Sequence, residues 1–128
     1  PAAIGAAIAN PQKKVICFTG DSSILMNVQE LATLAELNLN VTIIVLDNDA
    51  LGMVYKMQDK FYKKCHNESV YKKATNIAKV AEAFGIESRN FDYKMILDHK
   101  ENSSTEMANF IFGQNHPVLI QCKIPKAW

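Results

Sequence analysis

Two unbroken apolar runs, separated by one amphipathic segment, constrain the fold of this chain most strongly. Residues 15–19 and 41–46 are apolar throughout and rich in β-branched side chains, a pattern typical of parallel strands buried on both faces. Between them, residues 27–37 carry an apolar stripe at helical spacing, formed by Val28, Leu31, Ala32 and Ala35. Because a strand, a crossover helix and a parallel strand form a right-handed unit, both strand ends should meet at one edge of a sheet.

Three further helices are expected from the spacing of apolar residues. Residues 1–9 are rich in alanine, and residues 76–84 place Ile77, Val80, Ala81 and Phe84 on one face before Gly85 ends the helix. Asn27 with Glu30, and Ser103 with Glu106, have the spacing of capping boxes. The second pair predicts a helix that ends at Gly113 and turns Met107, Phe110 and Ile111 inward.

The remaining segments complete an alternating order of strands and helices. Strands are expected over residues 86–91 and Val118–Lys123, and a helix from Met53 toward Tyr62. Residues 93–100 predict a short helix or a loop. This order predicts an α/β fold, a three-layer sandwich in which a mostly parallel sheet carries helices on both faces.

Polar loops follow the first two predicted strands, at the edge where open α/β sheets bind ligands. The Asp21 carboxylate, the Asn48 amide oxygen and a backbone carbonyl near Ala50 are the hard oxygen ligands that Mg²⁺ prefers. The backbone amides of Gly20, Ser22 and Ser23 lead into a helix and would face an anion. The pattern therefore predicts magnesium holding a diphosphate, although two ordinary turns capped by Asp and Asn remain an alternative.

A calcium loop is a rival interpretation of the second polar loop. Asp47, Asp49 and Gly52 stand at positions 1, 3 and 6 of the calcium-loop template. Position 5 is Leu51 and position 12 is Gln58 in place of Glu, and a strand precedes the loop where the template has a helix. These departures count against calcium.

Composition limits the class of partner. A net charge of +1 gives no reason to expect nucleic acid or an anionic membrane, and the lysines of residues 56–73 are interleaved with acidic side chains and predict a solvated face. No apolar run approaches the roughly 20 residues of a membrane span. The cysteines Cys17, Cys65 and Cys122 have no metal or disulfide spacing and His66, His99 and His116 stand apart, which favours a reducing, cytoplasmic location and disfavours zinc.

The motif text resembles that of a known enzyme family. Gly20-Asp21-Ser22, a gap and Asp47-Asn48 resemble the thiamin-diphosphate signature, Gly-Asp-Gly, about 24 to 27 residues, then Asn-Asn. The chain as a whole is similar to the C-terminal, diphosphate-binding domain of acetolactate synthase (acetohydroxyacid synthase) large subunits. The matching text is residues 1–6, residues 27–33, Leu51-Gly52-Met53-Val54, Gln58, Phe61-Tyr62 and Pro117-Val118-Leu119-Ile120.

The resemblance implies thiamin diphosphate and Mg²⁺ as cofactors. It assigns cofactor contacts to Gly20, Asp21, Ser22, Ser23, Asn48, Ala50, Leu51, Gly52 and Met53, with Asp21, Asn48 and Ala50 as metal ligands. It further implies an enzyme of branched-chain amino-acid biosynthesis that decarboxylates pyruvate and joins the product to a second 2-oxo acid. Such an enzyme is a homodimer or homotetramer that can associate with a regulatory small subunit.

The resemblance also implies that residues 1–128 are one domain, a fragment of a larger enzyme. The glutamate that activates the cofactor belongs in the family to an N-terminal domain of the partner subunit, and the residue that bends the cofactor would precede Pro1. No residue is therefore assigned a catalytic role, and the isolated chain is expected to be inactive. Residues 59–75 resemble the family's mobile cover over the active site, and a plain surface connection with aromatic anchors is the alternative.

Four positions near the expected site carry further information. Met53 matches a residue that packs near the cofactor's reactive ring and the substrate, and Met57 stands where acetolactate synthases commonly carry Trp. Ser22 replaces a glycine, and Asp47 replaces the first Asn of the signature. We expect Asp47 to face away from the diphosphate and cap the following turn, because a carboxylate facing it would be repelled.

Two other functions stay open on the sequence. Met57 in place of Trp is compatible with another thiamin-diphosphate-dependent 2-oxo-acid decarboxylase, oxidase or carboligase. A non-enzymatic α/β binding module, in which the two loops have lost their ligands, is the third hypothesis.

Overall fold

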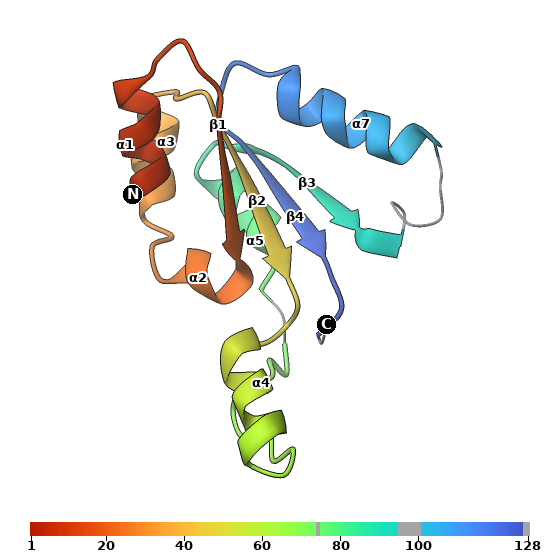
Figure 1. Ribbon diagram of the computed structural model, residues 1–128. Helices are drawn as coiled ribbons and strands as arrows, with labels where there is room; N and C mark the ends of the chain where they lie inside the picture. Colours follow the sequence, from red (N-terminus) through yellow and green to blue (C-terminus); the bar gives the residue numbers. More distant parts are fainter. Residues whose placement is uncertain (74, 95–100, 127–128) are drawn as a thin grey trace.

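A four-stranded parallel sheet forms the centre of the molecule. The computed structural model describes residues 1–73, 75–94 and 101–126. Strands β1 (Val15–Gly20), β2 (Val41–Asp47), β4 (Val118–Lys123) and β3 (Glu87–Asp92) lie in the order β1-β2-β4-β3, and every neighbouring pair is parallel (Figure 1). All four strands therefore end at the same edge, as the two apolar runs predicted.

Helices cover both faces of this sheet. Helices α1 (Ala2–Ala9), α3 (Glu30–Glu36) and α5 (Ile77–Ala83) pack on one face, where their side chains join Val41, Ile43 and Leu119 in a core. Helix α7 (Glu101–Phe112) packs on the other face through Phe110 and Ile111 (Figure 1). The predicted α/β sandwich, with helices on both faces of a parallel sheet, is confirmed.

The inward residues of the sheet follow the alternation of a pleated strand. In β2, Val41, Ile43 and Val45 face the α1, α3 and α5 side, whereas Ile44 and Leu46 face α7. All but Leu46 are buried, which explains why this strand is apolar except for Thr42 and the terminal Asp47. On the α7 side, β1 is less covered, and its Phe18 is 67% exposed.

The crossover between β1 and β2 differs from the prediction. The structure has a short helix α2 (Asp21–Leu25) directly after β1, a series of turns, and α3 from Glu30, in place of one helix over residues 27–37. The Asn27–Glu30 capping box is absent, because Asn27 lies within the run of turns and its carbonyl accepts from the Glu30 N–H at 3.0 Å. Consequently Leu31 and Leu34 are the buried residues of α3, while Ala32, predicted to face the core, is exposed.

The predicted helix start at Ser103 is also wrong. Helix α7 begins at Glu101, so Ser103 lies within its first turn and cannot precede the helix as a cap. Glu106, the expected partner in that box, instead accepts from Arg89 of β3 at 2.9 Å. The inward residues were predicted correctly, since Phe110 and Ile111 are buried and Met107 packs against them. Most of the predicted helix or loop over residues 93–100 lies outside the described residues.

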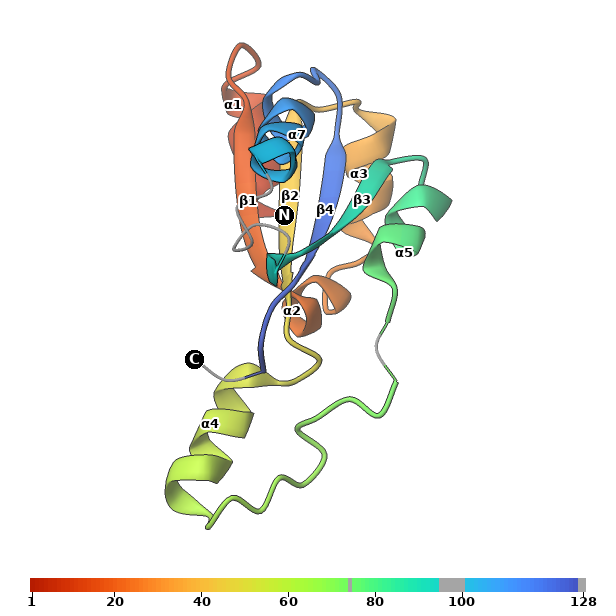
Figure 2. The ribbon, with the colours of Figure 1, turned by 90° about the vertical axis from the view of Figure 1, so that its right-hand side faces the viewer.

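Helix α4 (Gly52–Phe61) stands apart from the sandwich. It points away from the sheet beyond the strand ends, and residues 62–71 run back along it to the loop after β2 (Figures 1 and 2). The Gln58 amide donates to the Asn67 carbonyl at 3.0 Å, and His66 stacks on Tyr55 and contacts Asp59. None of the α4 residues is buried, and Met53, Met57 and Phe61 are exposed.

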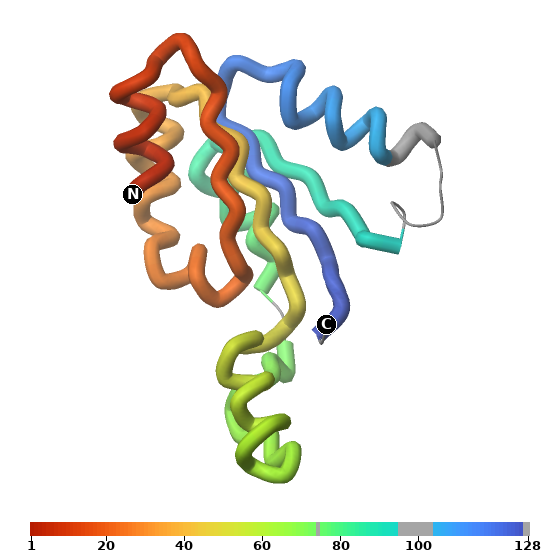
Figure 3. The backbone as a smooth tube through the Cα atoms, in the orientation of Figure 1, coloured from red at the N-terminus to blue at the C-terminus, as the bar shows by residue number. Residues whose placement is uncertain are grey.

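The chain path brings its C-terminal tail to the base of α4. After β4 the C-terminal tail leaves the sheet at the carboxyl ends of the strands, whereas helix α1 at the N-terminus packs on one face of the sheet (Figure 3). The Ile124 N–H donates to the Asp47 carbonyl at 2.9 Å. The tail therefore borders the same edge of the sheet as the two predicted ligand loops.

Candidate functional site

The two polar loops after β1 and β2 enclose one cavity. It has a volume of about 360 Å³ and lies at the carboxyl ends of the strands. Nine residues proposed from the sequence as cofactor contacts line it together: Gly20, Asp21, Ser22, Ser23, Asn48, Ala50, Leu51, Gly52 and Met53. The remaining wall comes from Met26, Leu46, Val54 and Ile124. The structure thus brings both loops into one site at the edge where open α/β sheets bind ligands.

Asp21 is a buried carboxylate with an incomplete set of partners. It is 6% exposed, and its Oδ1 accepts from the Ser22 N–H at 2.7 Å. Its Oδ2 is buried and has no hydrogen-bond partner among the described residues. Burial raises the pKa of Asp21 above its usual value, and the neighbouring Asp47 carboxylate raises it further, both by accepting a hydrogen bond from the protonated acid and by like-charge repulsion. An orphaned carboxylate oxygen of this kind fits a cation ligand.

Asp47 has the opposite environment, although it is equally buried. Its Oδ2 accepts from the Gln121 amide at 2.6 Å, its Oδ1 from the Asp49 N–H at 3.1 Å, and Lys123 lies 3.4 Å away. Burial acts to raise the pKa of Asp47, but these hydrogen bonds and the Lys123 charge outweigh it and lower the pKa. Asp47 therefore caps the turn after β2, as the sequence predicted.

The turn after β2 is tight and fixes the positions of Asn48 and Ala50 relative to each other. The Asn48 Oδ1 accepts from the Ala50 N–H at 3.2 Å, and Asp49 adopts a left-handed conformation with φ 55°. A Cβ atom on Gly52 would lie 2.8 Å from the Asn48 Nδ2, so a larger residue there would force the Asn48 side chain to shift. The loop thus holds an amide oxygen and a backbone carbonyl beside Asp21, which is a donor set that fits Mg²⁺.

Ser22 links the two loops. Its hydroxyl lies 3.3 Å from the Ala50 carbonyl and 2.6 Å from the phenol oxygen of Tyr71. Tyr71 in turn donates its N–H to the Asp49 carbonyl at 2.9 Å, and Ala50 forms an antiparallel bridge with Val70. The segment that returns from α4 therefore contacts both ligand loops, although none of its residues lines the cavity itself.

Sequence reasoning missed Gln121, Lys123 and Tyr71. Gln121 is buried and joins three parts of the fold, since its amide contacts Asp47, the Ala78 N–H and the Thr75 carbonyl. Lys123 lies 2.5 Å from Asp49 and 3.4 Å from Asp47. An amide inside the apolar run of the last strand was the available signal for Gln121. No local pattern could place Tyr71 beside Ser22.

The two methionines proposed near the substrate lie in different places. Met53 lines the cavity although it is 81% exposed. Met57 is 50% exposed on α4 and is not among the residues that line the cavity. The structure therefore places Met53, but not Met57, beside the two ligand loops.

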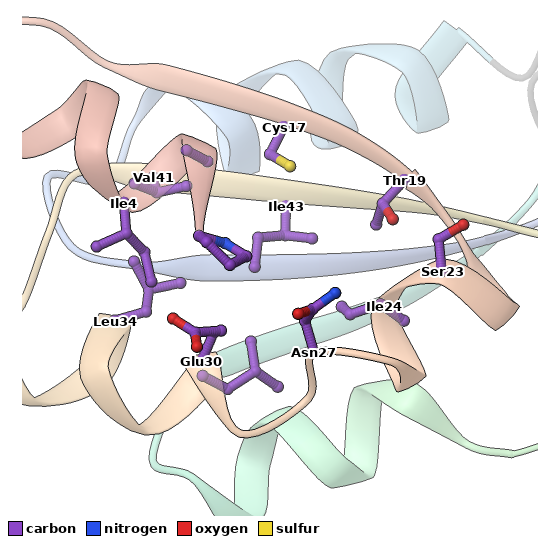
Figure 4. Close-up of a pocket in the computed structure, with 13 residues that line it drawn as sticks. Ile4, Cys17, Thr19, Ser23, Ile24, Asn27, Glu30, Leu34, Val41 and Ile43 are labelled. Carbon is purple, nitrogen blue, oxygen red and sulfur yellow. The ribbon is translucent and has the colours of Figure 1, made fainter.

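A smaller cavity of about 130 Å³ lies inside the sandwich, between α1, β1 and α3. Ile4, Leu34 and Val41 stand at one end of it and Thr19 and Ser23 at the other (Figure 4). Ser23 is the one predicted site residue that it shares with the first cavity. The side chains that could ligate a cation, Asp21 and Asn48, are absent from its lining.

Within the described residues, no group of three or more His, Cys, Asp or Glu side chains could hold a metal ion. A site on this chain would thus need amide or carbonyl oxygens, as Asn48 and Ala50 offer. None of the helices in the described part of the chain is long and apolar enough to cross a membrane.

The parallel sheet, with a cavity at the carboxyl ends of its strands, places this chain among the open α/β domains that bind ligands at this edge. The family described as "Thiamine pyrophosphate enzyme, C-terminal TPP binding domain" matches residues 1–122. The chain belongs to this family, and the resemblance seen in its sequence is confirmed.

Curated relatives with this domain are acetolactate synthases. The chain is 48% identical over 88 residues to the acetolactate synthase isozyme 1 large subunit of Escherichia coli, covering 69% of this chain and 16% of that protein. It is 47% identical over 92 residues to the probable acetolactate synthase large subunit of Methanococcus aeolicus, covering 72% of this chain and 15% of that protein. Over 97% of its length it is 37% identical to the acetolactate synthase large subunit of Porphyra purpurea, of which it covers 20%. The chain therefore spans a fifth or less of the length of each of these three relatives.

A solved structure shares the fold. The Rhodococcus jostii RHA1 thiamine diphosphate-dependent 4-hydroxybenzoylformate decarboxylase superposes with a TM-score of 0.81, over 98% of this chain and 22% of that one. The sequence identity is 22%, so this likeness supports the architecture alone.

Proposed function

We propose that this chain binds Mg²⁺ and the diphosphate of thiamin diphosphate as the C-terminal domain of a larger acetolactate synthase-like enzyme. The orphaned, buried Oδ2 of Asp21 carries this proposal, because the residue Asp21 lines one cavity with Asn48 and Ala50. A doubly charged cation there would supply the partner that this oxygen lacks.

Each part of the proposed site has a separate task. Asp21, the Asn48 amide oxygen and the Ala50 carbonyl would hold Mg²⁺, which keeps other positions for diphosphate oxygens and water. The backbone N–H groups of Gly20 and Ser23 would face the diphosphate, whereas the Ser22 N–H, also expected there from the sequence, donates to Asp21 Oδ1. Thiamin diphosphate, when bound, supplies the capacity to stabilise the carbanion left by decarboxylation of a 2-oxo acid.

Titration calorimetry tests the binding proposal. Full-length protein should bind thiamin diphosphate with saturation only when Mg²⁺ is present, and Asp21→Ala should weaken this binding by about 100-fold or more. Asp59→Ala, which removes a carboxylate on α4 outside the cavity, serves as the matched control and should bind like wild type. Equal binding by wild type and Asp21→Ala would remove the proposal.

The reaction is proposed from the same family membership. The full-length enzyme should form acetolactate from pyruvate, whereas the isolated 128 residues should be inactive. A 2-oxo-acid decarboxylase or oxidase is the second candidate, favoured by Met57 where acetolactate synthases commonly carry Trp. Acetaldehyde or peroxide as the product in place of acetolactate would select the second candidate.

A further inference from the structure

The phenol of Tyr71 meets the Ser22 hydroxyl beside the two ligand loops. We propose that Tyr71 is a positioning residue of the Mg²⁺ and diphosphate site, and that it acts through Ser22. The inference rests on the proposed function, which it extends to a segment of the chain that supplies none of the metal ligands proposed from the sequence. The two oxygens are 2.6 Å apart, which is the shortest contact that either hydroxyl makes.

The single proton of the Ser22 hydroxyl indicates which of the two hydroxyl groups donates in this hydrogen bond. The Ser22 hydroxyl has one proton and three oxygen neighbours: Tyr71 at 2.6 Å, and Asp21 Oδ1 and the Ala50 carbonyl at 3.3 Å each. Carbonyl and carboxylate oxygens only accept, whereas a phenol can also donate. All contacts are best satisfied when Tyr71 donates to Ser22 and Ser22 directs its proton to Asp21 or Ala50. The phenol thereby orients Ser22 toward two of the proposed cation ligands.

The position of Tyr71 is fixed by the loop that carries Ala50. Its N–H donates to the Asp49 carbonyl at 2.9 Å, and the Leu51 N–H donates to the Ser69 carbonyl at 2.9 Å. Tyr71 therefore spans the gap between the loop after β2 and Ser22 at the start of α2. Removing its hydroxyl should loosen the Ala50 carbonyl and Ser22 without removing any proposed ligand.

Tyr62 provides a matched control. It lies at the end of α4, is 62% exposed, and its phenol has no hydrogen bond among the described residues. Tyr62→Phe deletes the same atom as Tyr71→Phe at a position remote from the two loops. Both variants keep the aromatic ring, so neither creates a cavity.

The test is a calorimetric titration of full-length protein with Mg²⁺ at a fixed, saturating thiamin diphosphate concentration. Tyr71→Phe should raise the Kd for Mg²⁺ by about 3- to 10-fold, the range that one lost hydrogen bond supplies. Tyr62→Phe should leave it unchanged. Ser22→Ala should cause a loss similar to that of Tyr71→Phe, and the double variant should lose no more than Ser22→Ala alone.

The outcomes separate this inference from the function on which it rests. Unchanged Mg²⁺ affinity in Tyr71→Phe, or losses that multiply in the double variant, would overturn the role of Tyr71 and leave the proposed function standing. A lower melting temperature of ligand-free Tyr71→Phe with unchanged Mg²⁺ affinity would assign a purely structural role and would also overturn it. Wild-type protein that binds neither Mg²⁺ nor thiamin diphosphate would overturn both.

Discussion

The loops after β1 and β2 each place a buried aspartate at a strand end, but the two carboxylates have different sets of partners. Asp47 has a buried amide, a backbone N–H and a lysine as partners, and these lower its pKa. Asp21 has one carboxylate oxygen without a partner, and burial raises its pKa. Because unpaired buried charge is unfavourable, the comparison separates a carboxylate that stabilises the fold from one that we propose to bind a cation.

The largest effect on stability is expected from Asp47. Asp47→Ala removes the shorter of the two acceptors of the Gln121 amide and one of the two carboxylates beside Lys123, and should lower the free energy of unfolding by about 3 kcal/mol. Asp59→Ala is the control, because its pair with His66 is partly exposed and should contribute about 1 kcal/mol or less. Urea denaturation measures both, and equal values for the two variants would contradict the structural role of Asp47.

A smaller effect is expected at Gly52. Gly52→Ala places a Cβ atom 2.8 Å from the Asn48 amide and should lower the free energy of unfolding by about 2 kcal/mol while displacing a proposed Mg²⁺ ligand. In Gly5→Ala, within α1, the new Cβ atom meets nothing within 4 Å. The free energy of unfolding of that control should rise by up to about 1 kcal/mol, because Ala has a higher helix propensity than Gly. Thermal unfolding measures both variants. An unchanged melting temperature in Gly52→Ala would contradict this prediction.

Substitution of Asp21 should raise the free energy of unfolding, whereas substitution of Asp47 should lower it. Asp21→Asn removes a buried charge that lacks a partner, and should raise the free energy of unfolding of ligand-free protein by about 1 kcal/mol at pH 7. Denaturant unfolding in the presence of a chelator measures this gain. A clear loss of stability would show that Asp21 already has its partners within the protein.

The pH dependence of stability distinguishes the same two carboxylates. The pKa of Asp21 in the folded state is raised above its ordinary value, so the folded protein binds this proton more tightly than the unfolded chain does. The contribution of Asp21 to stability therefore rises as the pH falls through the folded-state pKa. The pKa of Asp47 is lowered, so its contribution is present above 3.8 and is lost as the pH falls through its folded pKa. Unfolding measured from pH 7 to pH 3 should therefore show Asp21→Asn losing its advantage over wild type as the pH decreases.

The smallest effect is expected on α4. Met57→Gln changes a side chain that is 50% exposed, and should alter the free energy of unfolding by less than about 0.5 kcal/mol. Denaturant unfolding measures it, with Leu34→Ala in α3 as the positive control. A large loss would mean that α4 packs more tightly than its exposure indicates.

Much of the fold could be predicted from local sequence. The run from Val41 to Leu46 is apolar except for Thr42 because the strand is covered on both faces, and Val118–Lys123 was predicted with its observed bounds. The start of α3 could not be predicted, because Asn27 and Glu30 have the spacing of a capping box whether or not a turn precedes them. Which turn forms there depends on packing of Ile24 and Leu31 on the sheet, a tertiary effect.

The sequence could predict that two loops share one cavity, because the order of the parallel strands alone brings those loops together. Asp21 and Asn48 follow neighbouring parallel strands, so chain topology brings their loops to one cavity. Tyr71 and Gln121 reach the loops from elsewhere in the chain, and no spacing in the sequence reports such contacts. Met57 could not be placed, since nothing in the sequence fixes the direction in which α4 leaves the sheet.

The stability of Asp21→Asn relative to wild type, with and without ligands, tests the central claim most directly. Without ligands the variant should melt at a higher temperature than wild type. With Mg²⁺ and thiamin diphosphate at about 100 times their Kd, wild type should gain roughly 2.7 kcal/mol and become the more stable protein. If the variant kept its advantage in the presence of both ligands, Asp21 would not be a cation ligand, and the proposed site would be contradicted.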